Sequence, residues 1–228
     1  MGFRLVRAAL TVLTLLSLLI CSEPAPLSGQ TPSASAVSRF LARHTLSSPS
    51  HRARRHLEAR SLRIKRDGWL DAITTSGPDG FTYEVVAEGG SSIVRHKVLR
   101  AALDAERRLW ADRSAGLTEA NYDLAADGIE NDSDRIRLTP RRKDSHLVDG
   151  WLLVSPDDGE LVEIRGRLAK GPSFWTPRVE VVRRYARIAG ATVPVSVEST
   201  SAVRFVGPST FAMHYDYEMV NGVDVALH

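Results

Sequence analysis

The segment that decides the fold lies near the end of the chain and reads VPVSVESTSAVRFVGPSTFAMHYDYEMV, Val193–Val220. Apolar and polar side chains alternate along it on both sides of the Gly207-Pro208 turn. A period of two with one apolar face is typical of antiparallel strands that cover a core on one side only. The segment therefore predicts two long antiparallel strands joined by a tight turn.

Other turns divide the rest of the chain into strands of the same kind. The stretches SGPDG (76–80) and SPDDG (155–159) each separate two alternating runs, and Asn221-Gly222 is a strong hairpin signal before a last short strand. Two helices are expected: a short one ending at His44, and a longer one over His96–Ala111 with a stripe of apolar side chains. Runs of strands with the helices set apart from them indicate an α+β fold with an antiparallel sheet.

The ratio of strands to helices indicates that this sheet is curved. About ten strands at a spacing of ~4.8 Å would span almost 50 Å, whereas one helix is only ~10 Å across. Two helices cover the apolar face only if the sheet curls around them, and such a sheet readily leaves a cavity. We therefore expect a strongly curved antiparallel half-barrel of about 9–11 strands with two helices plugging its concave side. A well-packed barrel without a void is the alternative.

The first residues predict export from the cytoplasm. Arg4 and Arg7 precede Ala8–Ile20, an unbroken stretch of apolar and small residues that has the length of a signal-peptide core and is shorter than a membrane span. We expect a signal peptide over residues 1–29, a leader with a first short helix over 30–50, and one domain over 51–228. A lipid anchor through Cys21 is the alternative to a cleaved soluble form, because this cysteine follows an apolar run.

Composition and charge exclude several classes of function. Cys21 is the only cysteine, so the expected mature chain has no disulfide, thiolate ligand or cysteine nucleophile. The net charge of +3 is close to neutral and calls for no polyanionic partner. The basic run HRARRHLEARSLRIKR (51–66) carries no aromatic side chain for base stacking, and export argues against nucleic acid. We interpret this run as a solvated strand face, with an anionic membrane surface as the alternative partner.

No catalytic or metal-binding constellation is evident in the sequence. The seven histidines show neither His-x-His nor His-x₃-His spacing. The Gly-rich turn at 89–92 has neither the residue order of a nucleophile elbow nor the lysine of a phosphate loop. His214 falls on the polar face of its strand. The sequence therefore predicts a non-enzymatic protein without a metal or another cofactor.

Six short stretches occur in an order that resembles a known family. They are EGGS (88–91), PRRKD (140–144), DGWLLV (149–154), VEIRG (162–166), PSFW (172–175) and FVGPST (205–210). Together with the leader they resemble the bacterial outer-membrane lipoprotein-sorting proteins, which are similar to the periplasmic lipoprotein carrier LolA, from about Arg55 to Tyr217. The segment 123–135 departs from this pattern, because it is short and acidic where another full strand would be expected.

The resemblance implies a function, a compartment and partners. A relative of these carriers would hold the acyl chains of a lipoprotein or lipid in an apolar cavity between sheet and helices, and shield them in the periplasm on the way to the outer membrane. It would be a monomer that exchanges cargo with membrane-bound donor and acceptor proteins, without catalysis or a cofactor. The alternative is a non-enzymatic envelope module on the same fold that binds or senses another protein.

Large apolar side chains are the candidates for lining such a cavity. Phe174 and Trp175 follow a Gly-Pro turn after a strand, where a half-barrel would have its rim, so we expect them at the entrance or as a plug at the cavity's end. The remaining candidates for lipid binding are Trp69, Phe81, Tyr83, Trp151, Leu153, Phe205, Phe211, Met213 and Tyr215. Each of these could instead be an ordinary core residue.

Overall fold

The computed structural model describes residues 35–44, 49–112, 116–173, 176, 178–204 and 207–225. Within this part of the chain it contains eleven strands and four helical segments. The helical segments are α1 (Ala36–His44), α2 (Ser92–Val94), the π-helical η1 (Arg95–Leu99) and α3 (Arg100–Asp112). The strands are β1 (His51–Ser61), β2 (Arg66–Gly77), β3 (Gly80–Gly90), β4 (Tyr122–Glu130), β5 (Ser133–Pro140), β6 (Val148–Val154), β7 (Leu161–Leu168), β8 (Arg178–Ile188), β9 (Ala191–Val203), β10 (Gly207–Val220) and β11 (Val223–Asp224).

All strands of the described residues belong to one antiparallel sheet in the order β3-β2-β1-β10-β9-β8-β7-β6-β5-β4, with the short β11 added to β10. The chain therefore builds one edge with β1–β3, crosses to the other edge, and returns strand by strand until β10 pairs with β1. In the described residues the edge strands β3 and β4 are not paired with each other, so the sheet is not closed into a barrel. The hairpin expected around Gly207 is confirmed as β9 and β10.

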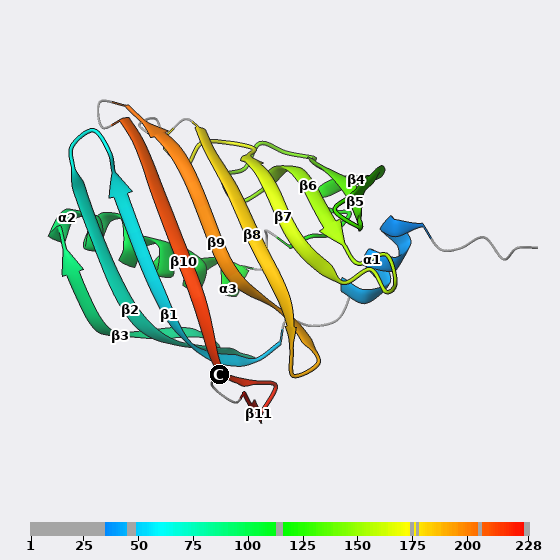
Figure 1. Ribbon diagram of the computed structural model, residues 1–228, viewed down its shortest axis with the longest axis horizontal. Helices are drawn as coiled ribbons and strands as arrows, with labels where there is room; N and C mark the ends of the chain where they lie inside the picture. Colours follow the sequence, from blue (N-terminus) through cyan, green and yellow to red (C-terminus); the bar gives the residue numbers. More distant parts are fainter. Residues whose placement is uncertain are drawn as a thin grey trace, which may run out of the picture. The chain divides into compact units, whose positions relative to one another are not determined.

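The helices lie on one face of this sheet. Segments α2, η1 and α3 form a continuous helical stretch that crosses behind the sheet in the view of Figure 1, and α1 lies toward the other end, near β4–β7. We call the face that carries α1 and α3 the helix-side face and the opposite one the outer face. The expected α+β class is confirmed: an open, curved antiparallel sheet has its helices on one side.

The basic run 51–66 forms β1, the turn after it and the first residue of β2, and along β1 the burial alternates from residue to residue. Arg52, Arg54 and Arg60 are exposed on the outer face, as expected for a solvated strand face. Arg55 contradicts that expectation, because its residue is 0 % exposed and lies on the helix-side face. A strand of period two turns every second residue toward the core, and in this register Arg55 shares a face with Leu57 and Ala59.

The acidic segment 123–135 forms most of β4 and the start of β5, so the sheet is complete where the sequence left a strand in question. The two strands are joined by Asn131 and Asp132, whose φ angles are 48° and 58°. Asn and Asp tolerate this left-handed conformation better than most residues, which suits them to a two-residue hairpin turn. Only Asp132 of the segment's acidic residues lies in this turn. The other four, which lie in the strands, each form an ion pair with an arginine: Asp123, Asp127, Glu130 and Asp134.

Two main clusters of buried apolar side chains lie between the helices and the sheet. The α3 core contains Leu57, Ala59, Leu70, Ala72, Phe81, Val94, Leu99, Leu103, Val197 and Met213. The α1 core contains Phe40, Tyr122, Ile136, Leu138, Leu147, Leu152, Val154, Leu161 and Ile164. The helix-side face is thus covered in two separate places. In the part of the chain that the structure describes, no helix has both the length and the apolarity of a membrane span.

Candidate ligand-binding face

One row of side chains crosses the helix-side face through both cores. Strand pairing aligns, from β2 to β5, Leu70, Leu57, Met213, Val197, Arg183, Ile164, Leu152 and Ile136. Every apolar member of this row is buried, whereas Arg183 is exposed. The register therefore places one cation in the middle of an otherwise apolar row.

Strand β8, which carries Arg183, is the border between the two cores. Val181 packs against the α3 core, and Tyr185 packs against the α1 core. None of the eleven residues of β8, all of them described, is buried, although β8 is paired on both sides. The helix-side residues of this strand, Val179, Val181, Arg183 and Tyr185, are called the β8 strip below. The strip is an accessible surface between two buried ones.

A pair of glycines lies beside the β8 strip. Gly166 of β7 pairs with Val181, and Gly150 of β6 pairs with Gly166. A Cβ atom built on Gly150 would lie 2.0 Å from the carbonyl oxygen of Arg165, so only glycine allows the two backbones to come this close. The row next to Arg183 therefore carries no side chain at two neighbouring positions.

The α3 core contains an ion pair between a buried arginine and a partly exposed carboxylate, because the side chain of Arg55 is 1% exposed and that of Glu106 is 31% exposed. The guanidinium of Arg55 donates to both carboxylate oxygens of Glu106, at 2.6 Å and 3.1 Å. It lies between two aromatic rings, with Cζ 5.0 Å from the ring centre of Phe81 and 4.4 Å from that of Tyr215. Burial alone would lower the pKa of Arg55, but Tyr215 and Glu106 raise it, so the side chain stays charged.

The phenols around this pair are neutral. Burial raises the pKa of Tyr215 and of Tyr217 far above the ordinary value of Tyr. The Tyr217 hydroxyl donates to the carbonyl oxygen of Pro194 at 2.6 Å, and the Tyr83 hydroxyl donates to Asp104 at 2.9 Å. The surroundings of the ion pair are therefore aromatic and hydrogen-bonded rather than purely aliphatic.

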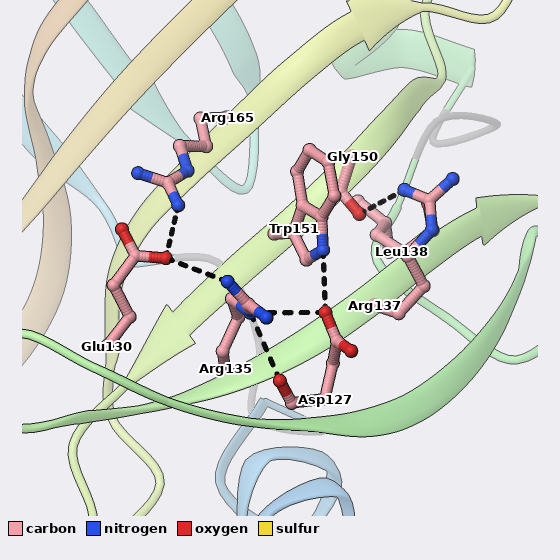
Figure 2. Close-up of polar contacts among 8 residues, drawn as sticks. All are labelled: Asp127, Glu130, Arg135, Arg137, Leu138, Gly150, Trp151 and Arg165. Carbon is pink, nitrogen blue, oxygen red and sulfur yellow. Dashed lines mark hydrogen bonds and ion pairs between the residues drawn. The ribbon is translucent and has the colours of Figure 1, made fainter.

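The outer face carries a lattice of alternating charges. Figure 2 shows Glu130 between Arg135 and Arg165, with Trp151 donating its ring N–H to Asp127 at 2.8 Å. The lattice continues across the sheet, because Arg184 contacts both Glu163 and Glu198, at 3.3 Å and 2.6 Å. Exposed ion pairs of this kind contribute only about 0–1 kcal/mol each, so we interpret the lattice as a solvated surface rather than a site.

The outer face also has a hollow of about 680 Å³ that is open to solvent. It lies between the β1–β2 turn and the outer sides of β8, β9 and β10. Leu62 and Trp69 contribute apolar surface, and Trp69 stacks on His56 at a ring distance of 6.1 Å. The charged side chains that line it are Glu58, Arg60, Asp67, Glu180 and Glu198. This hollow is open to solvent and lined by both apolar and charged side chains, unlike the apolar cavity expected from the sequence.

The structure divides the eleven side chains that we expected to bind lipid among three places. Phe81, Tyr83, Phe211, Met213 and Tyr215 come together on the helix-side face, in or against the α3 core. Trp69, Trp151 and Leu153 lie on the outer face, in register with the exposed or charged residues Glu58, Arg137 and Glu163. Phe174, Trp175 and Phe205 lie outside the described residues.

Three charged residues of the helix-side face were missed as site candidates. Arg55 and Arg183 stand in Arg-rich runs that look solvated in sequence, and Glu106 lies in the expected helix over His96–Ala111 without an assigned role. The signal for Arg183 was present in VEVVRRY (179–185), where it continues the alternation of Val179 and Val181. Within the described ranges, no three His, Cys, Asp or Glu side chains converge as metal ligands.

Comparisons with known proteins find likeness in structure only. No protein-family model and no curated protein matches the chain. The LolA superfamily protein NE2245 from Nitrosomonas europaea is 12% identical, with a TM-score of 0.49 over 85% of this chain and 96% of that chain. A Pseudomonas aeruginosa MucA/MucB complex is 11% identical and has a TM-score of 0.24. A complex of MucB with MucA(peri) is 10% identical and has a TM-score of 0.21. Each of these two matches covers 80% of this chain and 92% of the other chain. These values do not make the chain a member of the lipoprotein-sorting family, and its function has to be argued from its own geometry.

Proposed function

We propose that this protein is a non-enzymatic binding protein of the bacterial envelope that holds acyl chains against the helix-side face of its sheet. The observation that carries the proposal is the β8 strip, where Val179, Val181 and Tyr185 are only half-buried between two closed cores. Burying one CH₂ group on such a surface contributes about 0.8 kcal/mol, so a chain of ordinary length gains enough to bind. The cargo is a lipid or an acylated lipoprotein.

The leader sequence supports the place of action. Its basic start and the apolar stretch 8–20 have the pattern of a signal peptide, which would deliver the domain to the periplasm. There the protein would shield acyl chains from water between a membrane-bound donor and an outer-membrane acceptor. Shielding needs an accessible apolar surface and no catalytic group, and the β8 strip supplies that surface.

A second function has an observation of its own. The outer-face hollow exposes Leu62 and Trp69, whose residues are 58% and 38% exposed, next to several carboxylates. An exposed aromatic ring with charged neighbours is typical of protein contact surfaces. An envelope module that binds or senses another protein through this hollow is therefore the alternative.

Mass spectrometry of the native protein tests the proposal. We would purify the protein from a bacterial periplasm without detergent, extract it with organic solvent, and measure the acylated species per protein molecule. A roughly stoichiometric species is expected for the wild type. Val181→Asp should lose it, because the carboxylate would be buried under the chain.

The matched control is the next residue along the strand. Val182→Asp changes the outer face and should retain the acylated species, with both variants checked for the wild-type circular dichroism and melting temperature. An extract of the wild type without acylated species would overturn the proposal. Loss of a co-purifying protein in Val182→Asp alone would support the second function instead, because Val182 lines the outer hollow.

A further inference from the structure

We propose that Arg183 binds the anionic headgroup of the ligand, so that the protein selects negatively charged amphiphiles over neutral ones with the same chain. This inference rests on the proposed function and specifies its ligand class. The headgroup is a phosphate, sulfate or carboxylate, and the chain lies along the β8 strip.

The position of Arg183 is the first argument. Its two partners in the row are buried: Val197 of β9 is 7% exposed and Ile164 of β7 is 6% exposed. Arg183 itself is exposed. A guanidinium in a closed apolar row would be costly without a partner. The gap between the two cores leaves Arg183 accessible to a ligand from the helix side.

The charges around Arg183 are the second argument. Glu106 is the carboxylate on this side that acts on it electrostatically, and both oxygens of Glu106 already accept hydrogen bonds from Arg55. Two tyrosines also act on it: the hydroxyl of Tyr185, which interacts with Arg183 as a hydrogen-bond partner, and the neutral phenol of Tyr215. Two guanidiniums thus face one carboxylate. Among the described residues Arg183 has no ion-pair partner, so a positive charge is left for an anion.

The neighbouring arginine shows that this arrangement is not general along β8. Arg184 points to the outer face and pairs with Glu163 and Glu198. Its charge is therefore balanced within the sheet, although it is adjacent to Arg183 in sequence. The two residues share the strand and the side-chain type and differ in their face and in their partners.

The surroundings of Arg183 suit an amphiphile better than a free anion. Apolar surface flanks the guanidinium along the strand, with Val181 on one side and the ring of Tyr185 on the other. The glycines at 166 and 150 place no side chain next to Val181, and the close approach of their backbones fills the space where a Cβ would lie. An anionic oxygen pair can accept two hydrogen bonds from a guanidinium fork, and the attached chain then lies on the strip.

A headgroup series tests the inference on the full protein. We would titrate the protein with a fluorescent long-chain alkyl phosphate, with the alcohol of the same chain, and with inorganic phosphate as a competitor. The wild type should bind the alkyl phosphate about tenfold more tightly than the alcohol, which corresponds to one charge-assisted hydrogen bond. Arg183→Gln should remove this difference by weakening binding of the alkyl phosphate to the level of the alcohol, whereas Arg184→Gln should keep it.

The possible failures are distinguishable. Equal binding of both amphiphiles by the wild type, or a preference that survives Arg183→Gln, would overturn the headgroup site and leave the proposed function standing. Binding of neither amphiphile would overturn the proposed function. Tight binding of inorganic phosphate alone, lost in Arg183→Gln, would show a site for a free anion and would also overturn the amphiphile proposal. Arg183→Lys should keep part of the preference if charge is the determinant.

Discussion

The two cores under the helices cover neighbouring parts of one sheet and are built differently. The α1 core is closed by Phe40 of the helix and by apolar side chains of β5–β7, and its ion pair between Arg39 and Asp134 stays partly exposed. The α3 core encloses the guanidinium of Arg55 and pairs it with Glu106 of the helix, so that here the cation is fully buried although the carboxylate is partly exposed. The α1 core is therefore apolar at its centre, whereas the α3 core has a charged side chain there.

This difference indicates that one core mainly stabilises the fold and that the other fixes the position of a helix. A buried ion pair is seldom more stabilising than apolar side chains of the same size, because desolvation of two charges offsets their attraction. An apolar interface, however, tolerates small shifts of a helix, whereas a two-point hydrogen bond between Arg55 and Glu106 allows only one placement. We infer that the α1 core mainly stabilises the sheet, and that the ion pair holds α3 in place beside the β8 strip.

The largest effect should follow removal of one partner of the ion pair. Glu106→Ala would leave the side chain of Arg55, which is 1% exposed, buried without a counter-charge, and should lower the free energy of unfolding by about 3–5 kcal/mol. Urea denaturation followed by circular dichroism measures this. The double variant Arg55→Met with Glu106→Leu should recover most of the loss, and an equally unstable double variant would contradict the comparison.

Truncation of a side chain in the α1 core should lower the free energy of unfolding somewhat less, and no second substitution is expected to restore the loss. Leu152 is 0% exposed in the α1 core, and Leu152→Ala should lower the free energy of unfolding by about 2–5 kcal/mol, because it leaves a cavity. The loss should be the same at low and at high salt, as measured in the same denaturation assay. A loss that depended on salt would mean that charges contribute to this core as well.

A histidine beside each core should make the protein sensitive to acid, because burial lowers the pKa of His44 at the end of α1 as well as that of His51. His51, buried near Arg55, has its pKa lowered by burial and by the charge of Arg55, against smaller opposing effects of the Pro49 carbonyl and Glu106. The unfolded chain therefore binds the proton more readily. The free energy of unfolding should be highest above the ordinary His pKa of 6.5 and should fall as the pH drops below it, by at most about 1.4 kcal/mol per pH unit.

The variant His51→Gln separates this histidine from the others. It should flatten the fall in the free energy of unfolding below pH 6.5, measured by denaturation at several pH values. An unchanged slope would assign the acid sensitivity to other groups. Leu152→Ala is the matched control, because it should lower the whole curve and leave its slope as in the wild type.

The sequence was sufficient to predict where the strands lie, and insufficient to predict which parts of each face the helices cover. The alternation around Val197 and Met213 and the Gly207-Pro208 turn predicted β9 and β10, because both signals are local. Alternation also says that Arg183 shares a face with Val181. It does not say where along that face the helices end, since helix placement depends on contacts between residues far apart in the chain.

The same limit explains the candidate site. Aromatic side chains were expected to line a cavity, yet Trp69 and Trp151 face outward, because either side of a strand can carry an aromatic residue. The close approach of Gly150 and Gly166 needs the pairing of β6 with β7, which no single segment reveals. Residues whose roles depend on the partner strand or on the covering helix were thus beyond sequence reasoning.

The smallest effect is expected on the outer face, where charges are paired in water. Glu130→Gln removes one charge between Arg135 and Arg165 and should change the free energy of unfolding by no more than about 1 kcal/mol, with a smaller change at high salt. The same denaturation assay measures it. This value is far below that for Glu106→Ala, although both variants remove a carboxylate from arginine, because only Arg55 lies out of reach of water. A loss of several kcal/mol in Glu130→Gln would mean that the outer lattice stabilises the sheet as a unit, and the contrast between the two cores would then lose its meaning.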